Sequence, residues 1–195
     1  MGTLFYTHAV PLYVLIDVFF LYSFLGWLME CIVIHRETGA WENRGFAHSP
    51  LCVIYGFGAM LGYAALRPLA DNLILLYFVG ALAATGFEFL VGRMMQRLFG
   101  DFWWDYSGKR FNYKGILCLE SSIGWGIITL LVFLFLHRFV FWLVLRIPAL
   151  PGAALAVLLS GIYLVDFIAS CRKARRNWSG DAAQTEGTDH AGSAS

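Results

Sequence analysis

Five long apolar stretches, separated by shorter polar connections, dominate the sequence. They cover residues 10–33, 50–66, 73–92, 116–136 and 149–170. A helix needs about 20 mostly apolar residues to cross the hydrocarbon core of a bilayer. Because that core offers no water to backbone groups, apolar spans of this kind are helical. The pattern therefore predicts an all-α, polytopic membrane helix bundle with five transmembrane helices.

The connection between the fourth and fifth stretches, residues 137–148, has two interpretations. It is too apolar for a solvated loop, and Arg138 and Arg146 flank an aromatic run within it. That composition is typical of a segment lying in the membrane interface. Alternatively, the fourth helix extends through it. Pro148 would end the preceding helix in either case.

The rest of the chain is short or polar. We expect residues 1–171 to form the transmembrane helical bundle and residues 172–195, rich in Gly, Ala, Ser and Thr, to form a disordered cytoplasmic tail. Residues 1–9 contain no Lys or Arg, so they lack the positive region of a secretory signal peptide and the first span should be retained.

Composition excludes several classes of protein. Hydrophobic residues make up 59% of the 195 residues, charged residues 14%, and the mean hydropathy is +0.65. Soluble domains have about 45 to 50% and 25%, so a soluble globule could not bury this much apolar surface. The net charge of +1 gives no basic surface that would attract nucleic acid. The lipid bilayer is the expected partner, and nucleic acid is not.

The positions of the basic residues predict the orientation, because Lys and Arg are retained in cytoplasmic loops. With the N-terminus outside, only Arg67, Arg138 and Arg146 of the 14 Lys and Arg residues fall on the outer side. The sequence therefore predicts an outside N-terminus and a cytoplasmic C-terminus.

Acidic residues near the cytoplasmic ends of four spans are the candidate site. An ionised side chain at the centre of a spanning helix costs about 2.5 to 3.5 kcal/mol, so these acids should be paired, protonated or turned inward. The predicted substrate- or ion-binding residues are Glu30, Glu88, Arg93, Glu120 and Asp166. The alternative is a structural network in which the acids pair with Arg93, loop arginines and backbone amides.

Small residues predict where helices approach closely. Gly58 and Gly62 form a G-x-x-x-G pair on the second span, and Gly80 and Ala84 share a face of the third span with Glu88. We interpret the glycines as packing positions. Because Glu88 lies on such a face and cannot reach the membrane surface, it is the acid most expected to have a function.

The connection at residues 99–114 is rich in aromatic side chains interleaved with charged ones. Aromatic and Arg residues concentrate binding energy in protein interfaces, so we predict a docking loop for a protein partner. Its predicted docking residues are Trp103, Trp104, Asp105, Tyr106 and Asn112. The alternative is an interfacial belt that anchors the loop in lipid.

Motifs of enzymes and of metal sites are absent from the sequence. It has no G-x-x-x-x-G-K-[ST], H-E-x-x-H or G-x-S-x-G motif, so we expect no enzyme activity and no catalytic residues. The four cysteines contain no C-x-x-C pair, so neither a metal site nor a cofactor is expected.

A weak internal repeat relates two predicted helical hairpins, the first formed by the first and second spans and the second by the third and fourth spans. In the first, Glu30 is followed by Asn43 and Cys52, and in the second, Glu88 is followed by Asn112 and Cys118. The spacings from Glu to Asn differ, so coincidence is the alternative. Both hairpins run from outside to inside and back, which would make this a parallel repeat.

Several motifs, in order, resemble one family. They are Tyr22, Ser23, Gly26, Trp27 and Glu30; Asn43, Arg44 and Gly45; Pro50, Cys52, Ile54, Tyr55, Gly56, Phe57 and Gly58; Trp104, Asp105, Tyr106 and Ser107; and Asn112, Gly115, Cys118, Trp125 and Gly126. Between residues 20 and 130 the chain thus resembles the bacterial type IV ABC-transporter permeases, also called CmpB-like proteins.

The resemblance implies a multi-pass protein of the bacterial cytoplasmic membrane. As a permease subunit it would move a solute while a separate ATPase supplies the energy. The alternative is a non-transporting membrane scaffold or sensor whose aromatic cytoplasmic loop recruits a partner. A homo-oligomer is compatible with either interpretation.

Overall fold

A computed structural model describes residues 10–43, 45–100 and 104–192, with side chains described as far as Arg176. Within these ranges the chain is all-α apart from one small hairpin. The helices are α1 (Leu12–Thr38), α2 (Val53–Leu66), the 3₁₀ turn η1 (Arg67–Leu69), α3 (Leu73–Phe99), α4 (Leu119–Leu131), the π-helix η2 (Val132–Leu136), α5 (His137–Val144) and α6 (Ala149–Gly192). Strands β1 (Asn112–Tyr113) and β2 (Leu117–Cys118) pair antiparallel.

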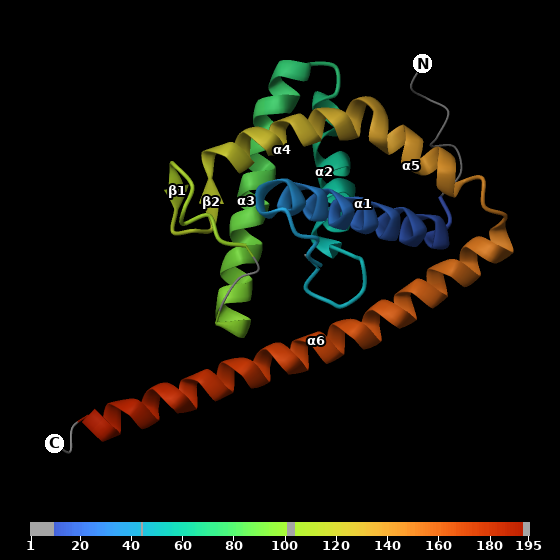
Figure 1. Ribbon diagram of the computed structural model, residues 1–195. Helices are drawn as coiled ribbons and strands as arrows, with labels where there is room; N and C mark the ends of the chain where they lie inside the picture. The colour runs from blue at the N-terminus through green and yellow to red at the C-terminus, as the bar shows by residue number, and fades with distance from the viewer. Residues whose placement is uncertain (1–9, 44, 101–103, 193–195) are drawn as a thin grey trace.

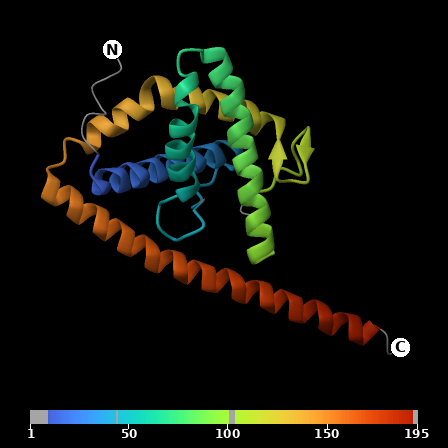
Figure 2. The ribbon, with the colours of Figure 1, turned by 180° about the vertical axis from the view of Figure 1, so that it is seen from behind.

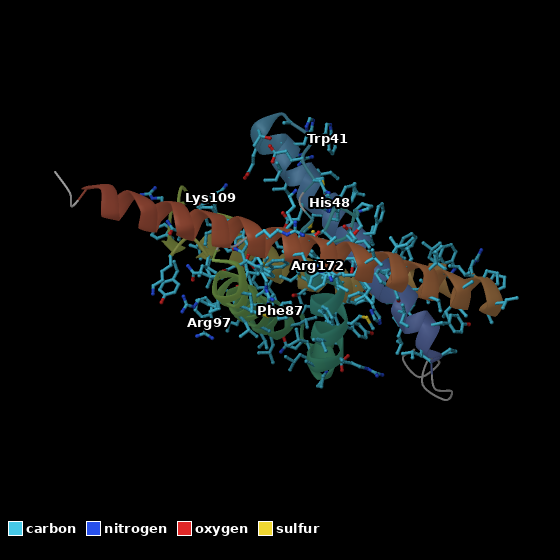
Figure 3. All side chains as sticks on the ribbon, turned by 90° about the horizontal axis from the view of Figure 1, so that it is seen from below. Trp41, His48, Phe87, Arg97, Lys109 and Arg172 are labelled. Carbon is cyan, nitrogen blue, oxygen red and sulfur yellow. The ribbon has the colours of Figure 1, made fainter. Side chains whose placement is uncertain are left out.

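The helices cross in two layers above a long α6. α2 and α3 run side by side in one layer, and α1 and the arch of α4 and α5 cross them in the other (Figure 1, and from behind in Figure 2). α6 passes below both layers. The view from below shows α6 crossing the other helices, with His48 close beside it (Figure 3).

Four helical segments are long and apolar enough to cross a membrane: Leu12–Thr38, Leu73–Phe99, Leu119–Val144 and Ala149–Arg176. They make this a multi-pass membrane protein. α2, expected as the second span, has 14 residues. At 1.5 Å per residue it covers about 21 Å, less than the roughly 30 Å of a bilayer core. The count of five spans, which requires the second predicted span, and the orientation of the termini stay predictions.

The fourth predicted span continues past residue 136. α4, η2 and α5 follow one another without a break, so the helix extends through most of residues 137–148, the alternative that the sequence left open. The π-helix at Val132–Leu136 is a local widening of the kind that bends helices. Helical structure stops at Val144 and resumes at Ala149, directly after Pro148.

The core lies where α1 packs against α5. Val14 and Val18 of α1 and Val140 and Val144 of α5 are nearly inaccessible. β-branched side chains have few rotamers to lose and pack closely along such a contact. α1 is also the most buried of the spanning helices, which places it at the centre of the molecule.

The glycines divide into packing positions and open positions. A Cβ on Gly80 would lie 2.5 Å from Thr129 of α4, so this glycine permits close helix contact, as predicted. Gly58 and Gly62 are different, because a Cβ on Gly58 would lie 3.8 Å from Phe87 and one on Gly62 would meet nothing within 4 Å. Gly58 is thus in ordinary contact distance of α3, whereas Gly62 borders open space, so the packing role predicted for Gly62 is wrong.

α6 is helical to Gly192, and it packs on α1 through contacts such as that between the rings of Phe20 and Tyr163. The division into a bundle at residues 1–171 and a disordered tail at residues 172–195 stays a prediction.

Candidate functional site

Glu88 of α3 is a buried acid of the membrane region that accepts three hydrogen bonds. Its Oε1 accepts a hydrogen bond from the hydroxyl of Tyr106 at 3.1 Å. Its Oε2 accepts the indole N–H of Trp125 at 3.0 Å and the hydroxyl of Ser121 at 3.4 Å. Only 4% of the residue is exposed. The sequence predicted this inward position from the small residues on the same face of α3.

All of these donors are neutral. Among the described residues, no Lys, Arg or His nitrogen lies within 4.0 Å of the Glu88 carboxylate. A buried carboxylate without a basic partner requires neutral donors, a proton or a bound cation. A carboxylate offers about four acceptor positions, and three are used here, so one remains for a ligand.

Glu30 of α1 is connected to Glu88 through an aromatic pair, Tyr55 and Trp125. Its carboxylate accepts a hydrogen bond from the hydroxyl of Tyr55 on α2. The rings of Tyr55 and Trp125 are 5.7 Å apart between centroids. Each ring therefore belongs to a residue that donates to one acid, and the two rings connect both acids into one site.

The two helical hairpins, α1 with α2 and α3 with α4, repeat this hydrogen bond. Cys52 and Cys118 directly precede α2 and α4. Three residues after each cysteine, the hydroxyl of Tyr55 or Ser121 lies within hydrogen-bond distance of the acid on the preceding long helix, and the Ser121 hydroxyl is shared with the backbone oxygen of Cys118 at 2.9 Å. The weak sequence repeat thus has a structural counterpart at the site.

The loops of the hairpins also resemble each other. The side-chain oxygen of Asn43 accepts the backbone N–H of Gly45 at 3.1 Å, and that of Asn112 accepts the backbone N–H of Gly115 at 3.2 Å. In both loops an Asn side chain replaces a missing backbone partner and fixes the return of the chain.

Two cavities, each of about 350 Å³, meet at Ile54, Tyr55, Glu88 and Trp125. The first, here named the inter-hairpin cavity, lies between the pair α1 and α2 and the pair α3 and α4. Among the described residues that line it, Glu88 alone carries a charged group. The second, the loop-side cavity, is also lined by Glu30, Glu88 and Arg175. Glu88 therefore borders both spaces.

The other residues predicted for this site lie elsewhere. Arg93 donates to Gln96 at 2.9 Å, three residues further along the same helix. The side chain of Glu120 is 63% exposed and lies 3.6 Å from Lys109. The structure therefore brings Glu30 and Glu88 together and leaves Arg93 and Glu120 out of this arrangement.

Asp166 of α6 holds the first loop. Its oxygens accept the backbone N–H groups of His48 at 3.2 Å and Ser49 at 2.6 Å, and Nδ1 of His48 lies 3.2 Å away. These contacts connect α6 to the segment that precedes α2. The arrangement corresponds to the structural network that the sequence left open for this acid.

The aromatic loop turns two of its predicted docking residues inward. Trp104 donates its indole N–H to the backbone oxygen of Ile116 at 2.8 Å and packs close to Gly92 of α3. Tyr106 reaches Glu88, and burial together with the charge of that carboxylate raises the pKa of the Tyr106 phenol. Tyr106 therefore remains a hydrogen-bond donor.

The remaining predicted docking residues shape the loop. Asp105 is exposed and accepts the backbone N–H of Ser107 at 2.8 Å. Hydrogen bonding from the Ser107 side chain, and then from its backbone, lowers the pKa of the Asp105 carboxyl. The side chain of Asn112 donates to the backbone oxygens of Ser107 at 3.2 Å and Lys109 at 2.9 Å. Trp103 lies outside the described residues.

Sequence reasoning assigned no role to Tyr55, Ser121 or Trp125. Tyr55 and Trp125 entered only as part of the family resemblance. The usable signal was the repeat itself, because Tyr55 and Ser121 occupy the same position after Cys52 and Cys118. In the part of the chain that the structure describes, no group of three or more His, Cys, Asp or Glu side chains could hold a metal ion.

Comparison with known proteins gives one result. A family model described as "Putative ABC-transporter type IV" matches residues 17–171, which include Glu30, Tyr55, Glu88 and Trp125. No curated protein and no solved structure gives a significant match.

Proposed function

Since the chain belongs to this type IV ABC-transporter family, we propose that it is the permease subunit of a transporter in the bacterial cytoplasmic membrane. It moves a solute while a separate ATPase supplies the energy. The chain itself carries no enzyme activity and no cofactor. Its N-terminus is outside and its C-terminus is cytoplasmic, as the placement of the basic residues indicates.

The observation that carries the proposal is the position of Glu88 between two cavities. A transport site has to be reachable from more than one side, and Glu88 lines both spaces. Polar groups inside membrane segments are expensive, so an acid retained there is a functional hypothesis by default. Ligands of membrane transporters are commonly bound between structural repeats, and Glu88 lies between the two hairpins.

Glu30 and Tyr55 extend the site toward the loops. The loop-side cavity contains two carboxylates and the guanidinium of Arg175, so it retains an excess of one negative charge when both acids are ionised. A cationic solute, a proton or an inorganic cation would neutralise this excess negative charge. In this proposal, Arg93, Glu120 and Asp166 act outside the solute path.

The test is to identify the proteins that copurify with the affinity-tagged chain in a mild detergent. An ATPase recovered in stoichiometric amount would support the proposal. Solute-stimulated ATP hydrolysis by that complex, lost in Glu88→Gln and kept in Glu120→Gln, would support the role of Glu88. A homo-oligomer that recovers no ATPase and shows no solute flux would overturn it.

A second candidate function, a membrane scaffold or sensor, is favoured by exposed aromatic side chains in and just before β1. Phe111 is 72% exposed and Tyr113 54% exposed. The guanidinium of Arg110 lies 5.7 Å from the ring of Phe111, and the ammonium of Lys114 lies 5.6 Å from the ring of Tyr113. These are residue types that anchor protein partners. Recovery of a non-ATPase partner that Phe111→Ala abolishes would favour this function.

A further inference from the structure

The inter-hairpin cavity has a chemical character that identifies a class of ligand. Its walls come from α1, α2, α3, α4 and η2, and they consist almost entirely of aliphatic and aromatic side chains. Glu88 contributes the one charged group among its described lining residues. From this combination we propose that the inter-hairpin cavity binds an amphipathic organic monocation, with its charge at Glu88 and its apolar body among the aromatic and aliphatic walls.

The charge of the ligand follows from the partners of Glu88. Its hydrogen bonds come from Tyr106, Ser121 and Trp125, which orient the carboxylate without neutralising it. A single buried negative charge in a site of low dielectric attracts a single positive charge strongly. An anion would be repelled, and a neutral solute would leave the carboxylate uncompensated.

Aromatic rings strengthen the preference for a cation. Tyr55, Trp125 and Phe87 line the cavity around the acid. The face of an aromatic ring attracts a cation that lies within about 6 Å of its centroid, and Trp does so most strongly. Quaternary ammonium and phosphonium groups use this attraction because they cannot donate hydrogen bonds.

The size of the cavity and its glycines determine the apolar part of the ligand. A volume of about 350 Å³ is within the range of small-molecule sites. Gly58 and Gly62 line it; a Cβ on Gly58 would only touch Phe87 at 3.8 Å, and one on Gly62 would meet nothing within 4 Å. Their missing side chains therefore create room for a ligand. An inorganic ion would leave this apolar space unfilled.

The inference rests on the proposed function only in placing the solute at Glu88, and its test needs neither an ATPase nor flux. The purified full chain in phosphatidylcholine nanodiscs is titrated with radiolabelled tetraphenylphosphonium, a fixed-charge monocation. Tetraphenylborate, with the same shape and the opposite charge, is the matched ligand control. Empty nanodiscs give the background of partition into lipid.

We expect saturable binding of tetraphenylphosphonium, weakened at least tenfold by Glu88→Gln and unchanged by Glu120→Gln, which removes an equal charge at an exposed position. Gly62→Leu should abolish binding, because the leucine side chain would fill the cavity while the Glu88 carboxylate is retained. Thermal unfolding of each variant shows that it is folded.

Three results would overturn the inference: no saturable binding, equal binding of tetraphenylborate, or full binding by the Glu88→Gln and Gly62→Leu variants. If an ATPase copurifies and Glu88 is needed for flux, but tetraphenylphosphonium does not bind, the proposed function stands and the ligand class is wrong. If binding follows Glu88 but no ATPase copurifies, the site stands and the proposed function is wrong.

Discussion

Glu88 and Trp125 are joined by a hydrogen bond of 3.0 Å between the indole nitrogen and a carboxylate oxygen, which connects α3 to α4. The same Trp125 ring contacts Tyr55, the donor to Glu30. One aromatic pair thus links the acids of both hairpins.

Replacing Glu88 by Gln separates a structural from a functional role. The amide keeps the size of the side chain and one acceptor oxygen, so some hydrogen bonds are retained while the negative charge is lost. We expect a change of about 1 kcal/mol or less in stability and loss of solute-dependent activity, measured by thermal unfolding and by flux in proteoliposomes. A large loss of stability would instead indicate a structural role, and normal stability with normal activity would exclude both.

The contact between α3 and α4 at Gly80 should not accept a side chain. A Cβ there would lie 2.5 Å from Cγ2 of Thr129, so Gly80→Val should push the helices apart and cost about 2 kcal/mol or more. The matched control is Gly86→Val on the same helix, where no neighbour lies within 4 Å. Equal melting temperatures for the two variants in detergent would contradict the observed packing.

Trp104 should act on stability before it acts on any partner. Its hydrogen bond to Ile116 and its contact at Gly92 attach the loop to α3, so Trp104→Ala should lower stability by about 2 kcal/mol. Asp105→Ala, at an exposed position, should change stability little. If the loop docks a protein partner, both substitutions should weaken recovery of that partner. If the loop anchors in lipid, only the Trp104 substitution should matter, and it should act on stability in the membrane. If neither alters recovery, stability or activity, the loop is a passive connection.

Lys109 should tether the aromatic loop to α1. Its ammonium lies 2.9 Å from Glu37 and 3.6 Å from Glu120. The hydrogen bond and charge of Glu37, followed by the charge of Glu120, raise the pKa of Lys109 above its ordinary value of 10.5. Because the pKa of Lys109 is raised in the folded protein, its stabilising effect is fully present below the ordinary pKa of 10.5. It is lost only as the pH rises through the higher pKa of the folded state.

Lys109→Gln should therefore speed amide hydrogen exchange in residues 112–118 at neutral pH, and high salt should remove the difference from the unmutated chain. Loop protection, once corrected for intrinsic exchange, should not change between about pH 6 and pH 9. A difference that persists in high salt would mean that Lys109 acts through packing and not through charge.

The orientation can be tested by reporter fusions. Because Lys and Arg concentrate on the side that carries the loops before α2 and β1, a reporter fused after Ala174 should be active only in a form that works in the cytoplasm. A reporter placed at Leu69 should be active only outside. Finding the end of α6 outside would reverse the predicted topology. Finding both sites on one side would mean that one of the three segments between them, α3, the continuous helix of α4 and α5, or α6, does not cross the membrane.

The hydropathy pattern of the sequence is sufficient to show that the chain is helical and belongs in a membrane. Partition into a bilayer depends on the length and hydropathy of a segment, and both are local properties that can be read directly. The inward position of Glu88 was also readable, because an acid within an apolar span has few alternatives to burial. The motifs in residues 20–130 were sufficient to indicate the family.

Which acids share a site depends on how the helices pack against one another. Hydropathy does not encode the rotation and register of one helix against another, because lipid tails are as apolar as the side chains they contact. Glu30 and Glu88 therefore meet through Tyr55 and Trp125, side chains to which no spacing assigned a role. Arg93 formed a local bond to Gln96, three residues away, because neighbours on one helix face need no tertiary contact to meet.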